Sequence, residues 1–304
     1  NNNEEISGQL NKKVTADGLF GSMTEVTGRN SDPFTRYSLD IDYEWSGIRT
    51  RANFEAHELI TIPARHLLET TWQTQLVPDP QHGTALLAWH NADYIVTRAS
   101  GKTQGVKVAD VRAPIALNGP WEVRFPANHG VPETLNMGKL TGWSDSGEFA
   151  IRKFSGTATL TTTFDFNGPL PNADEEVWLD LGDVHVMAEV QINGEPLGTL
   201  WAAPYRVEVG KKLRPGKNTL TVSVTNLWCN RLIADEGVKD GCKWFETGAL
   251  AEWPEWIEDG KLPEKSQRLT FTTWKHWRAE NVPPPSGLRG PVTLRFGKRI
   301  NLGD

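Results

Sequence analysis

The sequence predicts an all-β protein, in which a β-sandwich over residues 1–105 is followed by a jelly roll over residues 106–304. Helical periodicity is scarce, while many short runs alternate apolar and polar side chains with the period of two that strands show. Turn-forming dipeptides, of which Asn193-Gly194 and Pro215-Gly216 are the clearest, separate several of these runs. Because strands and helices do not alternate along the chain, a parallel α/β barrel is excluded and two packed sheets are expected.

The first 105 residues contain two strand-like segments and one helix-like segment. Residues 36–45 alternate as a strand does, and residues 86–98 are apolar and rich in strand-forming side chains. Residues 65–76 have helical periodicity. A polar, glycine-containing stretch at residues 99–113 marks the domain boundary, and a new strand is expected to begin within residues 114–125.

The second domain contains seven further strand-like runs. They lie at residues 156–166, 177–181, 188–192, 205–209, 219–224, 269–273 and 292–296. A second helix is predicted at residues 249–257, where Pro254 interrupts the pattern. Trp121, Trp178 and Trp201 lie in strand-like contexts and are predicted to pack into the core.

Composition and charge exclude several classes of partner. The chain has 304 residues and a net charge of −6, which argues against non-specific nucleic-acid binding. No run of apolar residues is long enough for a transmembrane helix, so no membrane partner is expected. Cys229 and Cys242 are too few for a disulfide scaffold or a zinc cluster. They either pair, if the protein is exported, or are two small buried thiols.

The motifs of several enzyme classes are missing. The sequence has no G-x-S-x-G, no H-E-x-x-H, no Walker loop and no G-x-G-x-x-G. The seven histidines are scattered without the spacing of metal ligands, so no metal site is predicted. These absences argue against classical serine hydrolases, nucleotide-binding enzymes and zinc enzymes.

The last third of the sequence concentrates tryptophan and carboxylate side chains. Seven of the 13 tryptophans follow residue 200, and eight acidic residues lie between Asp235 and Asp259. A pyranose ring has an apolar C–H face and a rim of hydroxyls, so its binding sites combine flat aromatic rings with polar side chains at the edge. The segment with Trp244, Trp253 and Trp256 has these side chains. The same inventory also fits a loop that packs over its own sandwich or docks another domain.

Five stretches between residues 117 and 292 carry a resemblance to a known family. They are LNGPWEVRF (117–125), KFSGTATLTTTFDF (153–166), VWLDLGDVHVMAEVQINGEPLGTLWAAPYRVEV (177–209), LRPGKNTLTVSVTNLWCNRLIADE (213–236) and TFTTWKHWRAENVPPPSGLRGPV (270–292). In order and spacing they resemble the C-terminal β region of bacterial family 106 glycoside hydrolases, the α-L-rhamnosidases. That region is similar to the galactose-binding-like, sugar-binding jelly roll of family 2 glycoside hydrolases, so this resemblance implies a galactose-binding-like second domain.

The sequence departs from this family in two respects. Ala234 stands where the family motif has glycine, which is expected to stiffen or redirect that loop. The family's catalytic carboxylates and calcium site lie in a preceding barrel domain that this sequence does not contain, so those residues are not carried over. No cofactor is therefore predicted, with calcium left open.

The first interpretation is a carbohydrate-binding accessory module of, or derived from, a rhamnosidase-like glycoside hydrolase, secreted or periplasmic. Its ligand is an oligosaccharide or polysaccharide, and a catalytic glycoside hydrolase domain is its expected protein partner. The predicted carbohydrate-binding residues are Trp228, Asn230, Arg231, Trp244, Trp253, Trp256, Trp274, His276 and Trp277, with Asp235 and Glu236 as further polar contacts. Asn230 and Arg231 are equally suited to tie the loop to its neighbours through buried hydrogen bonds.

Two alternatives remain at this stage. A free-standing glycoside hydrolase acting on a plant or algal polysaccharide needs two carboxylates across a cleft, and its candidates are Asp235, Glu236, Glu246, Glu255 and Glu258. A purely structural piece instead uses the tryptophan-rich surface to pack against a separate catalytic domain.

Overall fold

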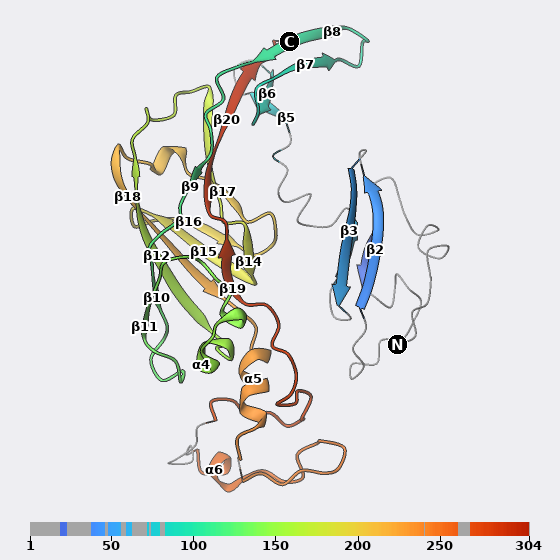
Figure 1. Ribbon diagram of the computed structural model, residues 1–304, viewed down its shortest axis with the longest axis vertical. Helices are drawn as coiled ribbons and strands as arrows, with labels where there is room; N and C mark the ends of the chain where they lie inside the picture. Colours follow the sequence, from blue (N-terminus) through green and yellow to red (C-terminus); the bar gives the residue numbers. More distant parts are fainter. Residues whose placement is uncertain are drawn as a thin grey trace. The chain divides into compact units, whose positions relative to one another are not determined.

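The computed structural model describes residues 19–22, 38–45, 48–55, 59–62, 72, 74–79, 83–239, 241–260 and 268–303. The chain divides into two compact units, Asn1–Trp72 and Gln73–Asp304. In the first unit, β1 (Leu19–Ser22) pairs with β4 (Leu59–Ile62), and β2 (Ser38–Trp45) pairs with β3 (Ile48–Glu55), both antiparallel (Figure 1). The strand predicted at residues 36–45 therefore forms over residues 38–45, and residues 36–37 lie outside the described residues.

The division between the units falls before the predicted domain boundary at residue 105. Strands β5 (Gln75–Asp79) and β6 (Gly83–Ala88) belong to the second unit, because β6 pairs with β20 (Thr293–Asn301) near the end of the chain. Most of the helix predicted at residues 65–76 lies outside the described residues, and its last two residues begin β5.

The second unit is built from two antiparallel sheets. One sheet has the strand order β11-β10-β12-β18-β15-β16, and the other has the order β17-β13-β20-β6-β5, with β9 also beside β20 (Figure 1). Their bounds are β9 Ile115–Ala116, β10 Trp121–Arg124, β11 Thr134–Met137, β12 Thr157–Phe166, β13 Glu175–Asp180, β15 Met187–Ile192, β16 Glu195–Leu200, β17 Arg206–Glu208 and β18 Gly216–Thr225. Short pairs are β7 (Ala92–Thr97) with β8 (Thr103–Val108), and β14 (Asp183–His185) with β19 (Gly287–Gly290). The predicted all-β class is confirmed.

Helices are few and short in the described residues. They are the 3-10 helices η1 (Trp143–Asp145) and η2 (Gly210–Lys212), and the α-helices α4 (Phe149–Arg152), α5 (Cys229–Glu236) and α6 (Glu255–Glu258). None of them has both the length and the hydropathy to cross a membrane.

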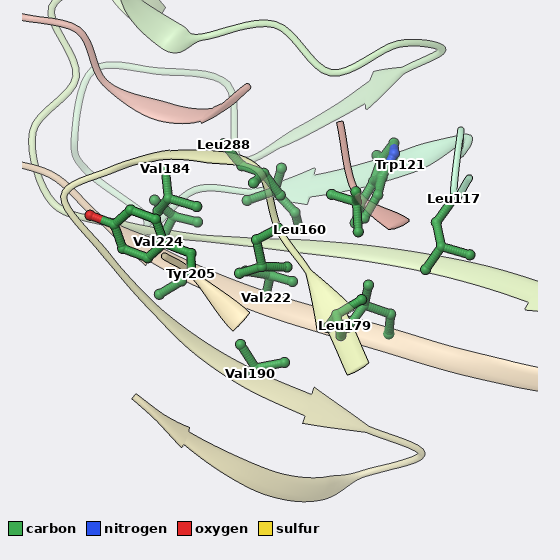
Figure 2. Packing of buried hydrophobic residues seen from close by; sticks show 14 of the residues in the cluster. Leu117, Trp121, Leu160, Leu179, Val184, Val190, Tyr205, Val222, Val224 and Leu288 are labelled. Carbon is green, nitrogen blue, oxygen red and sulfur yellow. The ribbon is translucent and has the colours of Figure 1, made fainter. Parts of the chain in front are cut away.

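The core lies between the two sheets and follows from the alternation of their strands. Alternate residues of β18 are buried, and they face apolar side chains of the second sheet (Figure 2). Trp121 lies in this core as predicted, whereas Trp178 is half-buried. The prediction for Trp201 is wrong, because this side chain is exposed. Leu200, the last residue of β16, pairs with the buried Ala188, so the side chain of Trp201 that follows it points to the outer face.

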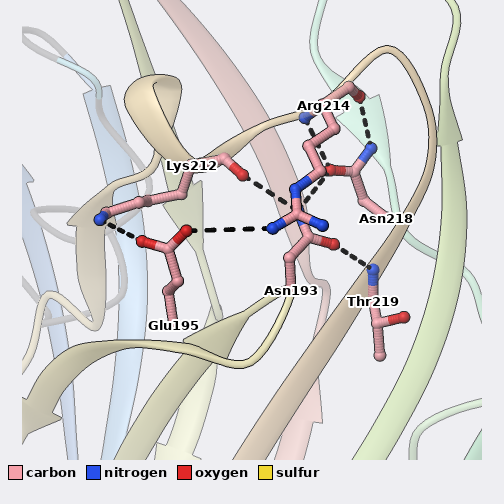
Figure 3. Close-up of polar contacts among 6 residues, drawn as sticks. All are labelled: Asn193, Glu195, Lys212, Arg214, Asn218 and Thr219. Carbon is pink, nitrogen blue, oxygen red and sulfur yellow. Dashed lines mark hydrogen bonds and ion pairs between the residues drawn. The ribbon is translucent and has the colours of Figure 1, made fainter.

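The two predicted turns are joined by a polar network at one end of the sandwich (Figure 3). Asn193 and Gly194 have φ of 54° and 82° and connect β15 to β16 as a two-residue hairpin. The buried Asn218 accepts from Arg214 N and donates to the carbonyls of Arg214 and Gly216, while Asn193 donates to Asn218 Oδ1 at 2.9 Å. An ion pair between Lys212 and Glu195 closes the network. This network fixes the register of the hairpin.

Three predicted elements differ from the structure. Residues 269–273 form no strand, because the backbone N–H groups of Leu269 and Thr270 donate to a carboxylate instead of a ladder. Of the helix predicted at 249–257, only residues 255–257 are helical, because Pro254 is the N-cap of α6 (Glu255–Glu258) rather than an interruption within a longer helix. The run at residues 86–98 is divided between β6 and β7 by a bend.

Candidate functional site

The candidate site is the segment that follows α5, residues 241–260 and 268–286, which we call the aromatic lobe. Its loops are held by backbone hydrogen bonds rather than by regular strands. Leu250 N donates to Thr273 O at 2.9 Å, and Lys275 N donates to Gly248 O at 2.8 Å. Isolated bridges pair Trp244 with Leu250 and Ala249 with Trp274. The lobe therefore presents its side chains from fixed backbone positions.

Helix α5 anchors the lobe through Asp235, whose exposed fraction is 0%. Asp235 Oδ2 accepts from Leu269 N, Thr270 N and Thr270 Oγ1, each at 2.8 Å. Its other oxygen pairs with Arg231 Nη2 at 2.6 Å. Three hydrogen bonds to Oδ2 and an ion pair at Oδ1 thus engage both oxygens of this buried carboxylate, which favours a structural role for Asp235.

Asn230 and Arg231 are also structural in this geometry. Asn230 is buried and donates from Nδ2 to Pro284 O at 3.0 Å, which ties α5 to the end of the lobe. Arg231 N donates to Ser155 Oγ at 2.9 Å, which ties α5 to the sandwich. These contacts fit the second interpretation of these two residues, as hydrogen-bonding anchors. Ala234 lies inside α5, where alanine suits the helix and no glycine is required.

The Lys275 ammonium contacts both Glu236 and Trp244. Lys275 Nζ lies 2.9 Å from Glu236 Oε1 and 4.9 Å from the centroid of the half-buried Trp244 ring. Nearby, a hydrogen bond to Glu252 and the charge of that carboxylate raise the pKa of Lys243. Lys275 is therefore engaged by an acid of α5, and Lys243 by an acid of the lobe.

Two tryptophans of the lobe, Trp253 and Trp274, are exposed. Trp253 and Trp256 flank Phe271, with ring centroids 6.0 and 5.5 Å away from it. Trp253 is 57% exposed and Trp274 is 59% exposed. The exposed His276 meets the half-buried Trp277 edge-on at 5.0 Å. Trp228 is exposed at the start of α5.

The predicted catalytic carboxylates are not arranged as a pair across a cleft. Asp235 is buried, and Glu236 is engaged by Lys275. Glu255 and Glu258 are exposed on one turn of α6, so they project from the same side of one helix. Glu246 is exposed in a loop of the lobe. This geometry does not favour a glycosidase mechanism on these residues.

Sequence reasoning missed Phe271 and the exposed Phe245, although both lie inside the segment that it singled out. The signal in the sequence that could have identified them is their aromatic side chains, within a segment already rich in tryptophan. No disulfide joins Cys229 to Cys242, and burial raises the pKa of the Cys229 thiol. In the described part of the chain, no three His, Cys, Asp or Glu side chains are grouped to hold a metal ion. Calcium binding stays untested.

Residues 145–246 match the family described as Glycosyl hydrolase 2 galactose-binding domain-like. The matched residues make up about a third of the chain and lie within the second unit. The match runs from η1 through the sandwich and α5 into the aromatic lobe. It confirms the galactose-binding-like part of the resemblance, whereas the assignment to family 106 stays a prediction.

The chain is 39% identical over 232 residues to the "Putative beta-glucuronidase" of Formosa agariphila, covering 74% of this chain and 18% of that protein. It therefore spans less than a fifth of that relative. A rhamnosidase from Novosphingobium sp. PP1Y is similar in structure, with a TM-score of 0.50 and 24% identity over 77% of this chain and 26% of that chain. This likeness shows the fold alone. A β-glucuronidase from Bifidobacterium dentium has a TM-score of 0.37 and 22% identity, over 63% of this chain and 31% of that one.

Proposed function

We propose that the chain is a carbohydrate-binding accessory module of a larger bacterial glycoside hydrolase. The exposed rings of Trp253 and Trp274 on backbone-fixed loops carry this proposal. The match to a glycoside hydrolase galactose-binding-like family and the much longer relative support it. The parent enzyme is proposed to be secreted or periplasmic, and to act on rhamnose- or glucuronate-containing saccharides.

The proposed ligand contacts are the exposed side chains of Trp228, Trp253, Trp274 and His276. A flat indole ring contacts the C–H face of a pyranose, and polar side chains at its rim hydrogen-bond the hydroxyls. Glu255 lies two residues after Trp253 and is exposed, so its carboxylate is available as a hydrogen-bond acceptor. Asn230, Arg231 and Asp235 position this surface without belonging to it.

Affinity measurements on tryptophan variants test the proposal. Isothermal titration with a panel of oligosaccharides and affinity electrophoresis on polysaccharides measure binding by wild type, Trp253→Ala and Trp274→Ala. Each variant is expected to lose about 5- to 150-fold in affinity, by analogy with other aromatic stacking contacts of about 1–3 kcal/mol. Trp201→Ala is the matched control, because Trp201 is exposed on the sandwich outside the lobe. Unchanged binding in both lobe variants rejects this surface.

A second candidate function is docking of another domain of the parent enzyme. The chain covers only 18% of its relative, and exposed tryptophans also suit a protein interface. Docking predicts self-association of the isolated chain through its uncovered surface, whereas sugar binding predicts a monomer. Sedimentation velocity of wild type and Trp253→Ala separates the two, because only docking gives oligomers that the variant abolishes.

A further inference from the structure

Helix α4 carries a lysine whose position is unusual for a charged group. Lys153 follows α4 directly and is only 7% exposed. Across the residues that the structure describes, its ammonium has neither an ion-pair partner nor a hydrogen-bond acceptor. Burial and the neighbouring Arg152 lower the pKa of Lys153. An ammonium that faces no counter-charge among the described residues favours an anionic partner that arrives from outside.

An exposed aromatic ring lies beside this cation. Phe149, the first residue of α4, is 63% exposed. Lys153 Nζ lies 5.8 Å from its ring centroid, and the Arg152 guanidinium carbon lies 5.9 Å from the same centroid. Two positive charges thus border one accessible apolar face. We call Phe149, Arg152 and Lys153 the basic corner.

The acidic residues near the basic corner do not neutralise it. Asp145, at the end of η1, pairs with Arg289 at 2.9 Å. Glu148 precedes α4 and is exposed, and its carboxylate is not among the groups that influence Lys153. Arg152 itself donates to the carbonyls of Ser146 and Gly147, which are neutral acceptors. The corner therefore keeps a net positive charge.

The basic corner connects to the proposed carbohydrate surface through Ser155. Ser155 Oγ donates to Leu227 O at 2.8 Å and accepts from Arg231 N, so α4 and the start of α5 lie side by side (Figure 1). The exposed Trp228 follows Leu227 directly. At the other end of the lobe, residues 252–259 hold four acids and no base, which repels an anionic sugar there. An acidic group is favoured at α4 and disfavoured at α6.

We propose that the basic corner binds the anionic group of an acidic pyranoside, with Phe149 against the sugar ring and with Lys153 and Arg152 at its carboxylate or sulfate. The identity of the ligand rests on the proposed carbohydrate-binding function. The residues of the basic corner differ from Trp253 and Trp274, which carry that function, so an experiment can reject either proposal without rejecting the other.

The test uses four small probes in NMR titrations of the whole chain. Methyl β-glucoside is neutral, methyl β-glucuronide carries a carboxylate, glucose 6-sulfate carries a sulfate ester, and inorganic sulfate carries no ring. The expected result is that one or both acidic sugars bind about tenfold more tightly than methyl β-glucoside and shift the amides of residues 149–155, as a charge-assisted hydrogen bond predicts. The sulfate and carboxylate arms show which anion is preferred.

Variants identify the groups responsible. Lys153→Met is expected to abolish the preference for acidic over neutral sugars, and Lys153→Arg is expected to retain part of that preference. Phe149→Ala is expected to lower the affinity for both acidic sugars. Lys217→Met is the matched control, because Lys217 is exposed at the far end of β18 from α5. Thermal unfolding of each variant verifies that it is folded.

Three results would overturn the proposal. They are equal affinity for neutral and acidic sugars, a preference that survives Lys153→Met, and binding of inorganic sulfate without any acidic sugar. If neutral oligosaccharides still bind through Trp253 and Trp274 in the first two cases, the proposed function stands alone. If acidic sugars bind at α4 while Trp253→Ala and Trp274→Ala have no effect, binding at the basic corner is supported and sugar binding by the two tryptophans is rejected.

Discussion

Replacing Asp235 by asparagine should weaken the attachment of the aromatic lobe to α5. The amide oxygen can still accept from Leu269 N, Thr270 N and Thr270 Oγ1, but the amide nitrogen then faces the Arg231 guanidinium, which is also a donor. The Arg231 side chain is only 12% exposed, so its charge is left buried without its counter-ion. Removing one partner of a buried pair costs about 3–5 kcal/mol, and we expect about 3 kcal/mol because Arg231 reaches some solvent.

This loss has two measurable consequences. For a unit of this size, about 3 kcal/mol corresponds to a fall in Tm of about 6–12 °C in a calorimetric scan. Hydrogen exchange by mass spectrometry should also show reduced protection at the amides of Leu269 and Thr270, because a neutral amide oxygen is a weaker acceptor than the carboxylate. Glu236→Gln is the control, since its ion pair with Lys275 is partly exposed and is worth at most about 1 kcal/mol.

The reasoning about Asp235 is refuted if Asp235→Asn unfolds within about 0.5 kcal/mol of wild type and keeps its amide protection. Asp235 would then be available as a ligand-binding or catalytic residue. A variant that is stable but loses a hydrolytic activity would support the enzyme interpretation directly.

Three further predictions concern stability and reactivity. Gly182→Ala should lower the free energy of unfolding in urea by more than about 2 kcal/mol, because φ is 65° and a Cβ would lie 2.6 Å from the Gly290 backbone. Gly216→Ala should lower it by about 1 kcal/mol, because φ is 75° but a Cβ there would meet open space. Lys153→Met should equal or exceed wild type in Tm at pH 7. Because the pKa of Lys153 is lowered in the folded chain, the unfolded chain binds more protons between that pKa and the ordinary value of 10.5. The stability of the wild type should therefore rise with pH across this range, relative to that of Lys153→Met. A stability difference that does not change with pH would contradict this. Cys229 should react with a thiol reagent at pH 8 only after unfolding, because burial raises its pKa, and rapid labelling of the native chain would show that the site opens.

The sandwich was largely predictable because its determinants are local. The alternation in β12 and β18 identifies buried and exposed faces, and Asn193-Gly194 specifies a two-residue hairpin through positive φ at both positions. Trp201 shows the limit of this reasoning, since one residue beyond the end of a strand decides which face a side chain takes.

The lobe was less predictable because long-range contacts decide its structure. Residues 269–273 have a strand-like pattern, but Asp235, more than 30 residues earlier, binds the backbone donors that a strand would use. Asn230 and Asp235 have side chains typical of sugar sites, and only their burial shows that they anchor the loop. Lys153 has no sequence signature at all, because the absence of a counter-charge is a property of the folded chain.

Fluorescence titration and a reducing-end assay, run together on one preparation with neutral and acidic oligosaccharides, test carbohydrate binding most directly. The predicted result is a change in tryptophan fluorescence without new reducing ends, and its loss in a Trp253→Ala/Trp274→Ala double variant. New reducing ends that disappear in Glu255→Gln, or no fluorescence change with any saccharide, would contradict a carbohydrate-binding module.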